Sequence, residues 1–65
     1  MLIKKDTIIY YSEIGHNNII YPNKDKFFTL QEDLVCETLP FFNSERFIAI
    51  RFHIKEYPSL YWIKP

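Results

Sequence analysis

Glycine and cysteine are almost absent from this chain, whose 65 residues include one of each. A single glycine excludes a Gly-rich phosphate loop. A single cysteine, Cys36, excludes a disulfide within the chain and agrees with a reducing compartment. Cys36, His16 and His53 also lack the paired spacing of a structural zinc site. We therefore expect neither a metal nor a cofactor.

Catalytic signatures are missing as well. A cysteine nucleophile needs a histidine within hydrogen-bond reach, and nothing in the sequence brings Cys36 to His16 or His53. Free cysteines are commonly buried and behave as small hydrophobic residues. No pair of carboxylates has a spacing that would place both on one surface. The sequence therefore predicts a protein that is not an enzyme.

Long hydrophobic runs are absent too. The longest strictly apolar runs, such as Ile8 to Tyr11, contain four residues. A signal peptide needs roughly 7–15 apolar residues and a membrane span about 20. We expect a cytoplasmic protein with no membrane association.

Net charge is absent overall, because eight basic residues balance eight acidic ones. Zero net charge argues against wholesale binding of polyanions. The charges are nevertheless unevenly placed, with an acidic middle over residues 24–45 and a basic segment over residues 46–65. A solvated or mutually facing arrangement of the two is the simplest interpretation.

Apolar and aromatic residues are abundant, at 48% and 18% of the chain. This composition is unlike that of disordered chains and predicts one small folded domain over residues 1–65. A domain of this size buries only roughly 60% of the surface that its unfolded chain exposes. We therefore expect support from a partner protein or from a homodimer.

The C-terminal third contains the clearest strand pattern. Over residues 46–56, side chains alternate at period two, which is typical of a strand with one face on a core. The apolar face consists of Ile48, Ile50, Phe52 and Ile54. The other face consists of Ala49, Arg51, His53 and Lys55. A tight turn at residues 57–59 and a short edge strand over residues 60–63 complete a predicted hairpin.

A second hairpin is predicted near the start of the chain. Residues 7–14 are β-branched and aromatic, residues 15–18 contain glycine and asparagine, which tolerate positive φ, and residues 19–21 form the return strand. Both faces of the first strand are apolar. It is either a central strand covered on both sides or a strand with one face open to a partner. Residues 22–26 are expected to form a polar loop.

Residues 29–39 are the one helical candidate. Thr29 and Glu32 match a capping box, apolar residues recur at helical spacing after them, and Pro40 would end the helix. The rival interpretation makes residues 34–39 a strand, but alternation there is poor. The elements together predict an α+β fold in which an antiparallel β-sheet of about four strands packs one short helix. A small SH3-like or OB-like β-barrel is the alternative.

Three surfaces are candidates for binding. Arg51, His53 and Lys55 form a basic stripe, extended by Tyr57 and by Tyr61 or Trp62 across the hairpin, and such a stripe suits single-stranded nucleic acid. The aromatic excess, above all the adjacent Phe41 and Phe42, suits a protein interface. The third surface is an acidic helix face made of Glu32, Asp33 and Glu37, with Asp25 and Glu45 nearby.

The sequence thus favours a small protein-binding module. Residues with AT-rich codons, such as Ile, Lys, Asn, Tyr and Phe, dominate the chain and indicate an AT-rich bacterium, phage or other mobile element. By analogy with accessory proteins of that size, we expect an inhibitor that occupies a surface of a larger host protein. The alternatives are a single-stranded nucleic-acid-binding module that uses residues 46–57 and a small subunit of a larger assembly. The candidate partner-binding residues are Phe41, Phe42, Arg51, His53, Lys55, Tyr57, Tyr61 and Trp62.

Overall fold

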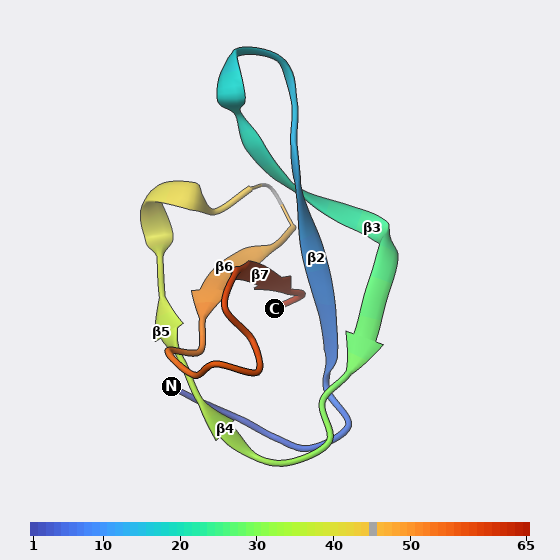
Figure 1. Ribbon diagram of the computed structural model, residues 1–65, viewed down its shortest axis with the longest axis vertical. Helices are drawn as coiled ribbons and strands as arrows, with labels where there is room; N and C mark the ends of the chain where they lie inside the picture. The colour runs from blue at the N-terminus through green and yellow to red at the C-terminus, as the bar shows by residue number, and fades with distance from the viewer. Residues whose placement is uncertain (45) are drawn as a thin grey trace.

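The computed structural model describes residues 1–44 and 46–65, and most of them are extended. Figure 1 shows the strands and two short 3-10 turns. The strands are β1 (Leu2–Ile3), β2 (Ile8–Ile14), β3 (Ile20–Thr29), β4 (Leu34–Val35), β5 (Glu37–Thr38), β6 (Ile48–Arg51) and β7 (Leu60–Ile63). The turns are η1 (His16–Asn18) and η2 (Pro40–Phe42).

Two antiparallel sheets organise the chain. The larger sheet has five strands in the order β3-β2-β7-β6-β5, and the smaller consists of β1 and β4. The chain passes from the small sheet to the large one at Cys36. Two hydrogen bonds join the backbones of Cys36 and Met1. The Cys36 N–H donates to the Met1 carbonyl at 2.7 Å, and the Met1 amino group donates to the Cys36 carbonyl at 2.9 Å.

The central strand β2 has one buried residue on each face, Ile9 and Tyr10, so the interpretation of a strand covered on both sides holds for this part of β2. Its other apolar residues, Ile8, Tyr11 and Ile14, are exposed. The strand lies between β3 and β7, and successive residues of a strand point to opposite faces. Ile9 and Tyr10 are accordingly buried in two separate clusters. The first cluster consists of Ile3, Ile9, Leu30, Cys36, Ile50, Phe52, Tyr61 and Ile63. The second consists of Tyr10, Ala49 and Trp62, with Ile20, Leu39, Phe47 and Leu60 packed against them.

The hairpin of β2 and β3 is confirmed, but the expected polar loop at residues 22–26 is wrong. β3 continues to Thr29 with its proline, Pro22, on an edge strand, where a missing N–H is tolerated. Tyr10 pairs with Phe27 and Tyr11 with Asn23, so residues 24–26 form a bulge of three extra residues. The far end of this hairpin projects beyond the rest of the molecule (Figure 1).

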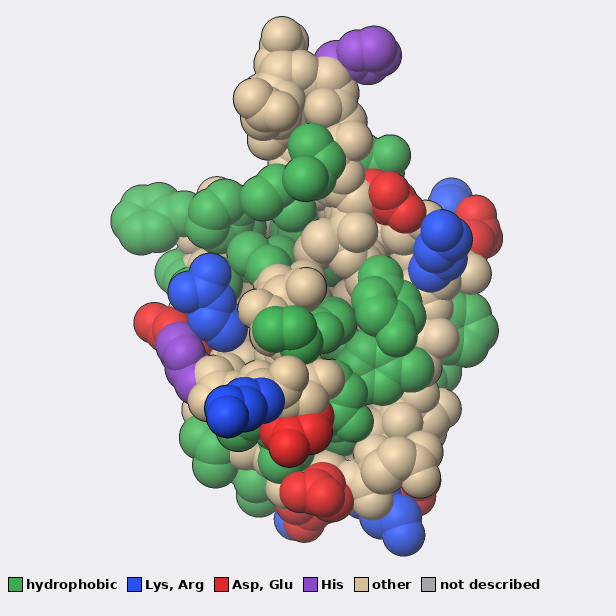
Figure 2. Space-filling model, viewed as in Figure 1, with side chains coloured by type: hydrophobic (Ala, Val, Ile, Leu, Met, Phe, Trp, Pro, Cys, Tyr) green, Lys and Arg blue, Asp and Glu red, His purple; other side chains and the backbone are tan. Residues whose placement is uncertain are grey.

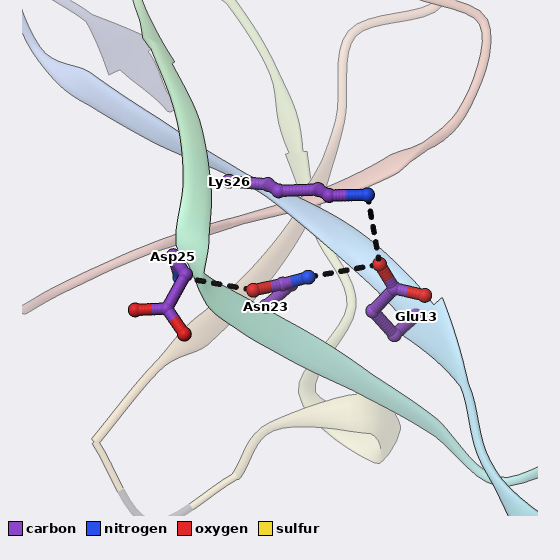
Figure 3. Close-up of polar contacts among 4 residues, drawn as sticks. All are labelled: Glu13, Asn23, Asp25 and Lys26. Atoms are coloured by element: carbon purple, nitrogen blue, oxygen red, sulfur yellow. Dashed lines mark hydrogen bonds and ion pairs between the residues drawn. The ribbon is translucent and has the colours of Figure 1, made fainter.

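Polar contacts hold the bulge in place (Figure 3). The Asn23 side-chain amide donates to Glu13 Oε1 at 2.8 Å, and Lys26 Nζ lies 3.9 Å from the same oxygen. The Asp25 N–H donates to Asn23 Oδ1 at 2.9 Å. The bulge is therefore a defined structure, because one carboxylate on β2 fastens two side chains of β3.

The predicted helix over residues 29–39 is wrong, and with it the α+β fold class. Thr29 ends β3, and residues 34–38 form β4 and β5. Leu34 and Cys36 turn inward while Val35 is 72% exposed, so the segment alternates as a strand does. The capping box does not form, because Thr29 is the last residue of β3 and no helix begins after it. The Gln31 side-chain amide instead donates to the Thr29 carbonyl. Burial of Leu30 and Cys36 in the first cluster outweighs the weak local preference for helix.

The barrel alternative is not observed either, because β3 and β5 stand at opposite edges of the five-stranded sheet. The fold is nearly all β, and the residues that the structure describes contain no α-helix. Nor do those residues include any helix with the length and apolar character needed to cross a membrane.

The strand predicted over residues 46–56 is shorter than expected. β6 ends at Arg51, because His53 adopts a φ of 51°, which leaves the β region. Ile50 and Phe52 are in the first cluster as predicted, but Ile54 is 39% exposed. The hairpin of β6 and β7 is confirmed, with Arg51 opposite Leu60. Its sharp reversal lies over residues 54–57 instead of 57–59, and β7 is an inner strand instead of an edge.

Candidate binding surfaces

Two of the predicted binding residues belong to the core. Tyr61 is 4% exposed and Trp62 is fully buried. Trp62 Nε1 donates to Ser12 Oγ at 2.8 Å, and Ser12 Oγ donates to the Leu60 carbonyl at 2.6 Å. Neither ring is available to a partner, so this part of the predicted site is corrected. Their position on an inner strand, which the sequence pattern placed at an edge, explains the error.

The other basic-stripe residues do come together, although only Arg51 lies on a strand, at the end of β6, while His53 and Lys55 lie in the loop after it. The loop after β6 folds around a hollow, here called the loop hollow, which is lined by Arg51, His53, Ile54, Lys55, Tyr57 and Pro58. His53 Nε2 lies 2.7 Å from Glu37 Oε1, so a carboxylate joins the three basic side chains. Basic, histidine and acidic side chains are mixed on the face shown in Figure 2. The charge of the loop hollow is therefore partly balanced within the protein.

The Tyr57 ring packs against the core and offers little open surface for stacking. Its ring is half-buried and lies parallel to that of Phe28, with centroids 5.2 Å apart and an interplanar angle of 6°. It also contacts the rings of Phe52 and Tyr61. The aromatic partners predicted for nucleic-acid stacking are thus engaged in packing.

The predicted pair Phe41 and Phe42 lies on the surface. A groove of about 430 Å³, here called the aromatic groove, separates the end of the β2–β3 hairpin from η2 and the residues after it. Phe41 is 98% exposed and Ile19, across the groove, is 62% exposed. The lining residues carry no charge: they are Asn18, Ile19, Ile20, Tyr21, Phe41, Phe42, Asn43 and Ser44.

Both walls of the aromatic groove are tied to the neighbouring chain by side-chain and backbone contacts. Asn43 Oδ1 accepts a hydrogen bond from Ala49 N–H at 3.0 Å, and Leu39 N–H donates to the Ala49 carbonyl at 2.9 Å. On the hairpin side, the Tyr21 ring lies against Gly15, where an added Cβ would come within 3.1 Å of Cε1. The backbone on both sides of the exposed rings is therefore ordered, and Figure 2 shows hydrophobic side chains spread across this part of the molecule.

The acidic surface does not form a helix face. Asp33 Oδ1 accepts the Lys5 N–H at 2.7 Å, Glu37 contacts His53, and Asp25 lies in the β3 bulge. Glu45 lies outside the described residues. Over residues 1–44 and 46–65, no three His, Cys, Asp or Glu side chains are arranged to hold a metal ion.

Cys36 is buried in the first cluster, where burial raises the pKa of its thiol and the Met1 amino group opposes this shift less strongly. Because thiolate is the reactive form, the native thiol is expected to react about tenfold or more slowly than the unfolded one. Reaction with an aromatic disulfide reagent at pH 8, with and without guanidinium, measures this ratio. Equal rates would show that the thiol is accessible in the native fold.

The sequence interpretation missed a further basic hollow, lined by Lys24, Arg46, Phe47, Lys64 and Pro65. Its members come from three distant segments, so no local pattern marks them. Comparisons with protein-family models, curated proteins and solved structures found nothing that matches this chain.

Proposed function

We propose that this chain is a small, non-enzymatic protein-binding module that docks through the aromatic groove. The observation that carries the proposal is the exposure of Phe41, 98%, in a loop that the Asn43 side chain fixes to β6. Contiguous exposed apolar surface bordered by polar groups is typical of interaction sites. A buried aromatic anchor in a partner's pocket contributes about 2 kcal/mol or more.

The partner's contact surface is expected to be apolar and uncharged at its centre. The groove presents the rings of Phe41, Phe42 and Tyr21 with the Ile19 side chain, and its polar groups are the amides and hydroxyls of its asparagines and serine. An unpaired charge placed there would lose its hydration without compensation. A chain of this size acts on a larger protein by covering its surface, and this action fits an inhibitor from a phage or mobile element.

Site-specific photo-crosslinking tests the docking surface. Benzoylphenylalanine in place of Phe41 is expected to capture one discrete protein from the native host. The same group in place of Val35, which is 72% exposed and lines neither the aromatic groove nor the basic hollow, is the matched control. Unlabelled wild type should compete for capture, whereas the Ile19→Ala/Phe41→Ala double variant should not. Equal capture from both positions, or equal competition by both competitors, would show that the groove is not the docking surface.

Of the residues in the nucleic-acid alternative, Arg51, His53 and Lys55 are on the surface, whereas Trp62 is buried in the core. This alternative remains a prediction for the loop hollow, and it is tested by the matched variants described in the next subsection.

Self-association is a separate expectation, which follows from the exposed apolar groove and the thin core. Sedimentation velocity over a hundredfold range of concentration is expected to show a reversible monomer–dimer equilibrium. Ile19→Ser should shift this equilibrium towards the monomer, since it removes apolar area from the groove without touching the core. A monomer at every concentration would restrict the groove to heterologous partners.

A further inference from the structure

The basic hollow that the sequence did not reveal is the second distinctive surface of the molecule. It measures about 530 Å³, within the range of roughly 300–1,000 Å³ that small-molecule sites occupy. Three of its lining residues are cations from separate parts of the chain. Lys24 comes from the β3 bulge, Arg46 from the turn before β6, and Lys64 from the residue after β7.

The β3 bulge places its two lysines in different environments. Lys26 lies 3.9 Å from Glu13 Oε1, which also accepts the Asn23 amide (Figure 3). Lys24, at the other end of the bulge, lines the basic hollow. The insertion of three residues into β3 therefore has a consequence for binding, since it brings one lysine to Arg46 and Lys64 while pairing the other.

Aromatic rings adjoin one of the three cations, Lys64. Lys64 Nζ lies 5.4 Å from the Tyr10 ring centroid and 6.0 Å from that of Phe47. The Tyr10 and Phe47 rings meet edge to face at 5.2 Å, and Phe27 packs on Tyr10 at 5.7 Å while remaining 54% exposed. Cations beside exposed ring surface form the combination that binds phosphate on one side and a planar base on the other.

The charge of the basic hollow indicates an anionic ligand. Among the described residues that line the basic hollow there are three cations and no aspartate or glutamate. In the loop hollow, by contrast, Glu37 lies against His53. Like charges gathered in this way repel one another and attract an anion, most strongly one with several charges.

We propose that the basic hollow binds a nucleotide, with its phosphates on Lys24, Arg46 and Lys64 and its base against the rings of Phe47 and Phe27. The nucleotide is either a free nucleoside polyphosphate or a unit of a single strand, since both present a phosphate next to a planar ring. This site is independent of the aromatic groove, with which it shares no lining residue.

Amide chemical-shift titration of the ¹⁵N-labelled protein tests the site. The probes are ATP, inorganic triphosphate, adenosine and an eight-nucleotide thymidine strand, without divalent cations at low salt. ATP is expected to shift the amides of Phe47 and Lys64 and to bind more tightly than triphosphate, with adenosine the weakest. The Lys24→Gln/Lys64→Gln variant should weaken ATP binding about tenfold or more, because two charge-assisted phosphate contacts are lost.

The matched control is Arg51→Gln/Lys55→Gln, which removes two positive charges from the loop hollow. It should leave ATP affinity within about twofold of wild type, because exposed charges outside the basic hollow are screened by salt. Tighter binding of the thymidine strand than of ATP, at the same amides, supports the site and assigns it to a single strand. Weaker binding of the strand supports the site and assigns it to a free nucleotide. Equal affinity for triphosphate and ATP, no shift at Phe47 and Lys64, or loss of binding in the control variant alone would each overturn the proposal.

Discussion

Phe52→Ala is expected to remove most or all of the free energy of unfolding of this domain at 25 °C. Phe52 is 1% exposed and packs against Tyr57 and Tyr61, with ring centroids at 5.5 and 6.0 Å. Truncating a buried phenylalanine costs about 3–5 kcal/mol. At roughly 0.05–0.15 kcal/mol per residue, a domain of this length has a total stability of about 3–10 kcal/mol. Circular dichroism during urea titration should therefore show no cooperative transition, or one at a much lower midpoint.

Phe41→Ala is the matched control, because it makes the same substitution at a ring that is 98% exposed. Its free energy of unfolding should lie within about 0.5 kcal/mol of the wild-type value. A Phe52→Ala protein that melts like Phe41→Ala would show that Phe52 is not part of the core.

Trp62→Ala is expected to be equally damaging, since Trp62 is the largest fully buried side chain and fills the second cluster. The expected loss is about 3–5 kcal/mol. Trp62 and Phe52 belong to different clusters. We therefore expect that neither cluster alone is sufficient to keep the domain folded. A cooperative melt of Trp62→Ala at the wild-type midpoint would contradict this dependence on both clusters.

Milder variants separate the hydrogen bonds of Trp62 from its volume. Ser12→Ala removes the acceptor of the Trp62 N–H and the donor to the Leu60 carbonyl, both in partly buried positions. Leaving such groups unpaired costs about 1–3 kcal/mol. Trp62→Phe removes the N–H but keeps a ring, and in the double variant the two losses should be less than additive. Full additivity in urea titrations would show that the Trp62–Ser12 hydrogen bond does not contribute to stability.

The sequence predicted the two hairpins well, because their signals are local. Gly15 and the asparagines that follow it mark the first connection, and Asn17 and Asn18 do adopt positive φ, each 60°. The apolar faces of the first strand left two possibilities for β2, a central strand or a strand with one face open to a partner, and the structure shows the central one. Local alternation also placed Ile50 and Phe52 correctly in a core.

The errors arose where tertiary contacts override local preference. Thr29 and Glu32 form a plausible helix start, but Leu30 is fully buried and its N–H donates to the Thr7 carbonyl, which commits this segment to sheet geometry. In β7, Tyr61 and Trp62 resemble exposed interface residues by type. Their burial depends on β2 pairing on one side of β7 and β6 on the other, and this order of strands is not encoded in any short segment.

Among the candidate surfaces, too, the sequence revealed those that depend on local signals and missed those that depend on tertiary contacts. Phe41 and Phe42 were interface candidates because they are adjacent aromatic residues, which is a local property of the sequence. The convergence of Lys24, Arg46 and Lys64 required the bulge register and the strand order, and no pattern in the sequence gives either.

The position of β2 between β3 and β7 also constrains when the domain can fold. β3 follows β2 directly in the chain, but the pairing of Tyr10 with Trp62 joins residues 52 positions apart. Contacts of such high sequence separation slow folding, because the intervening chain must be ordered before they form. During synthesis, the β2–β3 hairpin can form early, but Ile9 and Tyr10 stay uncovered until residues 60–63 have been made. The domain is therefore expected to complete its core only after β7 has been made, and the edge of β2 that pairs with β7 is open to other chains until then.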